Sequence, residues 1–190
     1  EEDILRLGGV SETEMNQSIV KSTKKRFIWL FLNLLTAILA SVVISFFDAS
    51  IEKMVALAIL MPIVASMGGN AGTQTLTLTV RSLATKELVD TNRKKVFIKE
   101  IAISILNGLI FAVIASLATI LWFNDLSLAV IVGAAMIINI FSAGLFGFLI
   151  PYSLNYFRVD PALASSVFVT TVTDVFGFLS FLGLASFFLF

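Results

Sequence analysis

The sequence predicts an all-α membrane protein with five transmembrane helices per subunit, and three observations support this fold class. Of the 190 residues, 58% are hydrophobic and only 14% are charged, whereas about a quarter of a soluble domain is charged. Basic residues gather in the segments between alternate apolar runs. Five runs also reach or exceed the roughly 20 apolar residues that cross a bilayer core, and they lie at about 27–47, 54–80, 101–123, 128–150 and 162–190.

The first half of the chain contains the linker and the two spans that follow it. Residues 1–26 are predicted to be a cytoplasmic linker, with a short amphipathic helix over residues 11–19 capped by Ser11. A tight acidic turn at 48–53 joins the first two spans. The second span is longer than a membrane needs, and Pro62 and three glycines, Gly68, Gly69 and Gly72, are expected to weaken or break its helix.

The second half of the chain fixes the predicted orientation. A basic loop over residues 81–100 leads to the third span, and short connections lead to the fourth and fifth. Eleven basic residues lie on one side of the membrane against Lys53 on the other, which predicts N-in, C-out topology. The positive-inside signal explains the loop without a nucleic-acid partner, although a lipid-phosphate patch is an alternative. Five spans form no simple inverted repeat, so a central pore would relate two chains of a homodimer.

Asp174 is the one charged residue in the fifth apolar run, and it lies near its middle. An aspartate at the centre of a spanning helix costs roughly 2.5–3.5 kcal/mol, so it usually faces a partner or a water path. Small and polar residues recur at steps of three and four around it, which places them on one helix face. We interpret this face as a cation site; the alternative is a protonated aspartic acid hydrogen-bonded to another helix. Its members are Ser166, Thr170, Thr173, Asp174 and Gly177.

A second polar stripe runs along the second span. Its amides and hydroxyls offer oxygen ligands without the cost of charge, although hydrogen bonds between packed helices would explain the same pattern. The G-x-x-x-G-type spacing of Gly68 and Gly72 favours close helix packing. The stripe comprises Ser66, Asn70, Thr73 or Gln74, and Thr77, running toward Arg81.

The composition also limits the function. The chain has no histidine and no cysteine, which removes the usual zinc ligands, general base and thiolate, so an enzyme is not expected. An intramembrane aspartyl protease would need two catalytic carboxylates. An assembly scaffold would leave the polar stripes unexplained. A divalent-cation channel is the leading hypothesis, and a carrier that exchanges magnesium, manganese or cobalt for sodium ions or protons is the alternative.

Five segments resemble the MgtE family of magnesium channels and transporters. The most specific is P-x5-G-G-N-x-G-x-Q, from Pro62 to Gln74. In the same order as in that family follow RSLAT at 81–85, VFIKE at 96–100, DPA at 160–162 and VTTVTD at 169–174. The resemblance covers nearly the whole chain, and LRLGGV at 5–10 resembles the segment that joins the family's cytoplasmic regulatory part to its membrane part.

The resemblance implies a multi-pass plasma-membrane protein, a homodimer with a central pore lined by the second and fifth helices. It assigns the pore carboxylate to Asp174, a carbonyl ligand to Thr170, and a pore-side asparagine to Asn70. Transported and bound Mg²⁺, membrane lipid and an upstream cytoplasmic regulatory domain are the implied partners. Val167 stands where many relatives carry proline, so this turn is expected to be straighter. The pore-lining set that we predict is Ser166, Thr173, Gly177, Asn70, Gln74, Thr77 and Gly69.

Overall fold

The computed structural model describes residues 2–8, 10, 17–89 and 91–189, and these residues form helices joined by short connections. The predicted helix at 11–19 falls mostly outside them. Five helices, α2, α4, α5, α6 and α7, are long and apolar enough to cross a membrane, which confirms the predicted all-α class and the five spans. The elements are α1 (Glu2–Leu7), α2 (Ile19–Ser45), α3 (Asp48–Lys53), α4 (Val55–Ala84), α5 (Arg93–Phe123), α6 (Leu126–Tyr156) and α7 (Pro161–Leu189).

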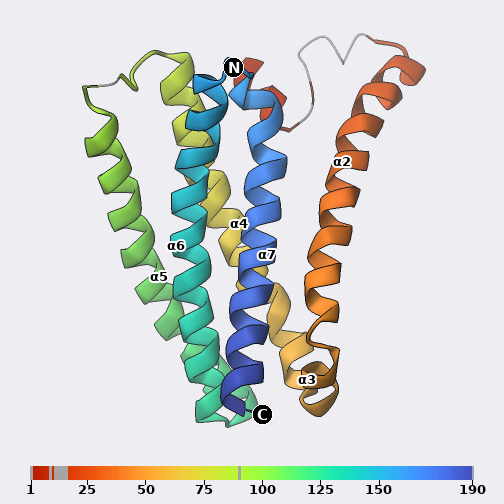
Figure 1. Cartoon of the computed structure of the whole chain (residues 1–190), viewed down its shortest axis with the longest axis vertical. Coiled ribbons are helices and arrows are strands. Elements are labelled where there is room, and N and C mark those ends of the chain that lie inside the picture. The colour runs from red at the N-terminus through yellow and green to blue at the C-terminus, as the bar shows by residue number, and fades with distance from the viewer. Residues whose placement is uncertain (1, 9, 11–16, 90, 190) are drawn as a thin grey trace.

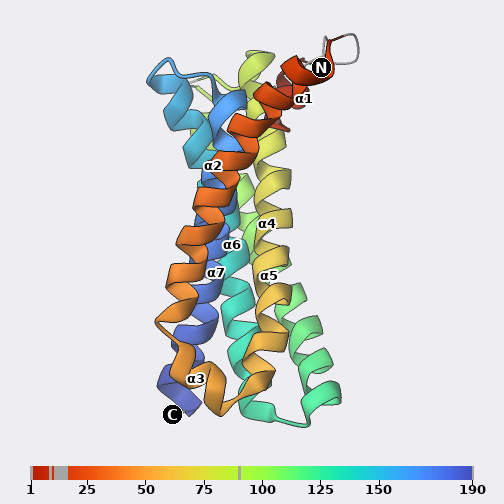
Figure 2. The ribbon, with the colours of Figure 1, turned by 90° about the vertical axis from the view of Figure 1, so that its right-hand side faces the viewer.

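Helix α6 is the centre of the bundle and packs against α4, α5 and α7 (Figure 1). Its residues are mostly apolar or small, and more of them are buried than in any other long helix, although Val130, Ile138 and Leu149 are exposed. Helices α4 and α7 also pack on each other, and seen from the side they lie next to one another behind α2 (Figure 2). Helix α2 contacts α7 and diverges from the bundle toward its own N-terminus, so most of its apolar surface is exposed.

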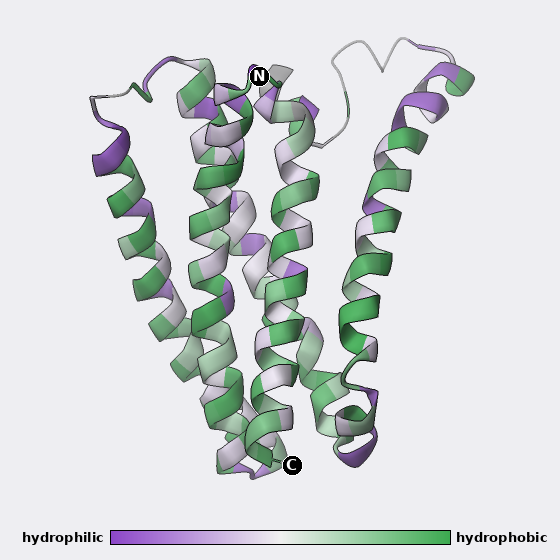
Figure 3. Ribbon diagram, in the orientation of Figure 1, coloured by the Kyte–Doolittle hydropathy of each residue, from purple (hydrophilic) through white to green (hydrophobic). Residues whose placement is uncertain are grey.

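Charged residues collect at the two ends of the bundle, and the middle of each long helix is mostly apolar (Figure 3). The eleven basic residues counted on one side of the predicted membrane all lie at the end that holds the N-terminus, here called the basic end, while Lys53 lies in α3 at the other end. The helices extend beyond the apolar runs because lysine and arginine are good helix formers whose charged ends can stay in water. Thus α5 begins at Arg93 and α2 at Ile19.

Two local expectations were wrong. The segment from Asp48 to Lys53 is the short helix α3 rather than a tight turn. Helix α4 is continuous from Val55 to Ala84 despite Pro62, because a proline removes a single backbone hydrogen bond that a membrane helix can tolerate. Its glycines Gly68 and Gly72 allow neighbouring helices to approach closely, as their spacing favoured. Helix α7 is likewise continuous through Val167.

Candidate ion site on the open faces of α4 and α7

Gly72 marks the contact between α4 and α7. A Cβ atom at this position would lie 2.8 Å from Val169 Cγ1 and 3.3 Å from Thr173 Cγ2 on α7, and 3.7 Å from Ala143 Cβ on α6. Helix α6 therefore covers one side of the α4–α7 contact. Further along α7, a Cβ atom on Gly177 would lie 3.4 Å from the Cα atom of Ala65 on α4, so the two helices stay close over at least one turn.

The predicted polar stripe of α7 divides into a buried part and an open part. Thr173 is 0% exposed and Gly177 is buried, so both lie against helices of the same chain. Thr170 is exposed, and Ser166 and Asp174 are half-buried. The open part of the stripe thus consists of Ser166, Thr170 and Asp174, in the first half and the middle of α7.

The polar stripe of α4 lies on the outside of the bundle. A Cβ atom on Gly69 would meet nothing within 4 Å. Successive residues of a helix are about 100° apart around its axis. On α4 and on α7, the polar residues that follow the Gly72–Thr173 contact around the axis therefore face away from α6. Both sets lie on the same side of the bundle. The open face so defined comprises Ser166, Thr170 and Asp174 of α7 with Ser66, Gly69, Asn70, Thr73, Gln74 and Thr77 of α4.

Within the described residues, the Asp174 carboxylate has no hydrogen bond or ion pair. The Thr73 hydroxyl donates to the Gly69 carbonyl of its own helix at 2.8 Å, and the Asn70 and Gln74 amides bond to no other helix in this part of the chain. Hydrogen bonding between helices of one chain therefore does not account for either stripe. The polar groups point out of the bundle at the level of its apolar middle.

Asn139 of α6 is a buried polar residue to which the sequence assigned no role. It is 0% exposed, and its Nδ2 donates to the Val64 carbonyl of α4 at 2.8 Å. A Cβ atom on Gly68 would overlap this amide, and one on Gly177 would lie 2.7 Å from Nδ2. Asn139 thus occupies the notch between α4 and α7 formed by the two glycines. The one signal in the sequence was a strongly polar amide within a long run of mostly apolar residues.

Glu100 is a buried carboxylate, unlike the half-buried Asp174, and the sequence placed it at the end of the basic loop. In the structure it lies two turns into α5, is 4% exposed, and accepts a 3.2 Å hydrogen bond from the Thr75 hydroxyl of α4. Among the residues that the structure describes, no three acidic side chains converge to form a metal site. One chain therefore offers Asp174 as a single charge on the open face.

Comparison with known proteins identifies the family. The MgtE family model, described as a divalent cation transporter, matches residues 61–184. The magnesium transporter MgtE of Thermus thermophilus is 34% identical over 187 residues, which is 97% of this chain and 41% of that protein. The MgtE transporters of Bacillus subtilis and Enterococcus faecalis are 31% and 30% identical, over 87% and 98% of this chain.

This chain spans about two fifths of the length of these relatives. The family's description is that of a transporter rather than an enzyme, in agreement with the expectation from the missing histidine and cysteine. Five helices long enough to span a bilayer agree with a multi-pass membrane protein. The chain belongs to the MgtE family of divalent cation transporters.

Proposed function

We propose that this chain is the membrane domain of a magnesium transporter, and that two copies place their open faces together around a pore lined by α4 and α7. One observation carries the proposal: Asp174 lies in the middle of α7, on a polar face, with no partner among the described residues of its own chain. A charge left in this position in lipid is costly. A second copy and a hydrated cation would remove that cost.

The ligand chemistry of the open face suits Mg²⁺. This ion prefers oxygen ligands in an octahedral arrangement, keeps several of its waters and uses one or two carboxylates. Two Asp174 side chains would supply a charge that matches the ion. The exposed Thr170 hydroxyl can bond to retained waters, while its carbonyl already accepts a 3.0 Å hydrogen bond from Thr173. The proposed ion is therefore bound mainly through water.

The relatives support the choice of ion and of cellular setting. Three of them are named magnesium transporters, and we extend that substrate to this chain. The proposed location is the plasma membrane, with N-in, C-out orientation. Because the relatives are more than twice as long, we also propose that a cytoplasmic regulatory part precedes residue 1 in the full protein.

A coupled carrier is the second candidate function, and the buried Glu100 is the observation that favours it. Exchange of a metal for protons or sodium ions needs additional titrating groups, and Glu100 is a carboxylate within the helical bundle. It lies on α5 against α4 rather than on the open face. In a carrier that used Glu100, the metal ion and the proton would therefore follow separate paths. This separation favours the channel over the carrier.

Flux into liposomes tests the proposal. Purified protein is reconstituted with an internal magnesium dye, and the wild type is compared with Asp174→Asn and Glu100→Gln. A channel predicts magnesium entry that Asp174→Asn abolishes and Glu100→Gln leaves unchanged, without proton or sodium movement in the opposite direction. Stoichiometric counter-movement that Glu100→Gln abolishes would establish the carrier. Full flux through Asp174→Asn would refute the proposed site.

A further inference from the structure

A cavity opens between α5 and α6 at the basic end of the bundle, away from the open face. Its volume is about 280 Å³. Two cationic side chains stand on the first turn of α5, and aromatic and aliphatic side chains form the rest of the wall. The lining residues are Arg93, Lys94, Phe97, Phe148, Leu149 and Tyr152.

The aromatic side chains form a continuous column along this cavity. The rings of Phe97 and Phe148 are 5.3 Å apart, and the rings of Phe148 and Tyr152 stack with centroids 6.0 Å apart and 11° between their planes. The guanidinium carbon of Arg93 lies 5.2 Å from the centroid of the Tyr152 ring, and Arg93 also donates a hydrogen bond to the Tyr152 hydroxyl. These contacts hold the Arg93 side chain at the end of the aromatic column that is nearest the basic end of the bundle.

The cavity lies where the helices pass from the aqueous to the apolar region. Arg93, Lys94, Lys95 and Lys99 fall in the first two turns of α5, and uncharged sequence begins at Ile101. Phosphate is the anion of phospholipid headgroups, and clusters of basic residues at this level attract it by about 1 kcal/mol per charge. Among the described residues, those that line the cavity include no acidic side chain. The nearby Glu100 is buried on another side, against Thr75 of α4.

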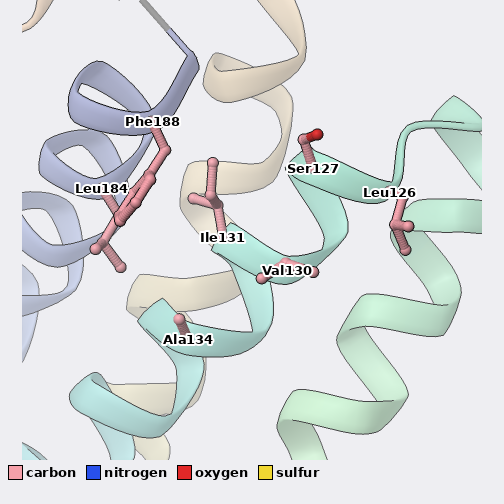
Figure 4. Close-up of a pocket in the computed structure, with 7 residues that line it drawn as sticks. All are labelled: Leu126, Ser127, Val130, Ile131, Ala134, Leu184 and Phe188. Atoms are coloured by element: carbon pink, nitrogen blue, oxygen red, sulfur yellow. The ribbon is translucent and has the colours of Figure 1, made fainter.

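A second cavity, at the opposite end of the bundle, provides a contrast (Figure 4). It has a volume of about 390 Å³, and it lies between α6 and the last turns of α7, which contribute Leu184 and Phe188. Among the described residues that line it, Ser127 is the one with a polar side chain. Such a surface has nothing to select one lipid headgroup over another, whereas the cavity at the basic end combines charge with an apolar column.

We propose that the cavity between α5 and α6 is a binding site for an anionic phospholipid. The headgroup phosphate accepts hydrogen bonds from Lys94 and Arg93, and an acyl chain follows Phe97, Phe148 and Leu149 toward the centre of the membrane. A free phosphate ion could use the two cations but would leave the aromatic column uncovered. The site does not depend on the proposed pore or on which face of the membrane the basic end occupies.

Native mass spectrometry of the purified full chain tests this site. The protein is titrated with phosphatidylglycerol and, separately, with zwitterionic phosphatidylcholine of the same chain length. The variants are Lys94→Gln, the double change Arg93→Gln with Lys94→Gln, and Lys86→Gln as the matched control, because Lys86 is an exposed lysine of the same end that does not line the cavity. Thermal unfolding without added lipid verifies that each variant is folded.

We expect phosphatidylglycerol to bind more tightly than phosphatidylcholine. Loss of about 1 kcal/mol per basic residue corresponds to about fivefold weaker binding for Lys94→Gln and about 25-fold for the double variant. Lys86→Gln should bind as the wild type does. Equal binding of both lipids, equal losses in Lys86→Gln and Lys94→Gln, or displacement of the lipid by inorganic phosphate at a similar concentration would overturn the proposal.

Discussion

Asn139 and Asp174 are both polar residues in the apolar middle of the bundle, and their surroundings differ. Asn139 is enclosed by α4 and α7 of its own chain and bonds to the Val64 carbonyl. Asp174, three residues before the glycine that touches Asn139, has no partner among the described residues and faces outward. The first therefore serves the packing of one chain, whereas the second, in the proposed pore, faces a second copy and a hydrated cation. Polarity at membrane depth alone does not separate these two roles.

The two neighbouring glycines of α4 show the same contrast at one residue's distance. Gly68 contacts Asn139, and Gly69 faces open space. Packing within the chain leaves no room for a side chain at Gly68. At Gly69 there is room for one unless another copy of the chain covers this position. These pairs allow the inner and outer faces to be perturbed separately.

The largest effect is expected from Asp174→Asn, which removes the charge but keeps the size and hydrogen-bonding capacity. At an effective dielectric near 20, a charge pair about 4 Å apart contributes on the order of 4 kcal/mol, and each 1.4 kcal/mol is tenfold in occupancy. Retained waters weaken this, so magnesium flux should fall by about a hundredfold or more. Flux into liposomes measures it, and an unchanged melting temperature is the control. Asp174→Glu should keep part of the flux.

Crosslinking should separate the outer from the inner face in an all-or-none way. The chain has no cysteine, so single cysteines report cleanly. Thr170→Cys, on the open face, should form a disulfide-linked dimer in membranes. Gly177→Cys, buried against α4 and α6, and Leu106→Cys, exposed on α5, should not. Efficient dimer formation through Leu106 but not Thr170, read on a non-reducing gel, would move the interface away from α4 and α7.

A smaller effect on stability should distinguish Gly68 from Gly69. Overpacking a filled core typically costs 1–3 kcal/mol, so Gly68→Ala should lower the free energy of unfolding by about that amount. Adding Asn139→Ala should recover part of the loss, because the two side chains then no longer compete for one space. Gly69→Ala should be neutral or stabilise by up to about 1 kcal/mol through helix propensity. Unfolding in mixed micelles provides the measurement, and equal losses at both glycines would contradict this packing.

The smallest change is expected for Glu100→Gln. The amide can still accept the hydrogen bond from Thr75, so stability should change by less than about 1 kcal/mol. Thr75→Val is the matched variant, since it removes the donor and leaves the carboxylate buried. It should destabilise the protein more, by about 1–3 kcal/mol. The reverse order, measured by chemical denaturation, would show that the Glu100 charge has another partner.

The sequence predicted the fold class and the number of spans well, because run length and charge placement are imposed by the membrane itself. The polar stripe that it identified on α4 lies on one exposed or half-exposed side of that helix, and its role as a pore lining stays a prediction. The sequence did not distinguish Thr173 and Gly177, which are buried against other helices of the chain, from Asp174, which lies on the open face. Residues at steps of three and four cover a wide arc of a helix, so one part of the arc can be buried while another part is open. The role of Asn139 depends on which glycines lie opposite, and spacing within one helix does not contain that information.

The central position of α6 has a consequence for the way the chain is made. Synthesis runs from the N-terminus, so α4 enters the membrane before α6 and α7, the two helices that cover its inner face. Until they arrive, Gly68 and Gly72 on that inner face contact lipid or the insertion machinery instead of α6 and α7. In the interval α4 has to remain inserted through its own apolar residues. A charge added to α4 should therefore reduce the yield of inserted protein more than the same charge added to α7. When α7 enters the membrane, the helices that it packs against are already inserted.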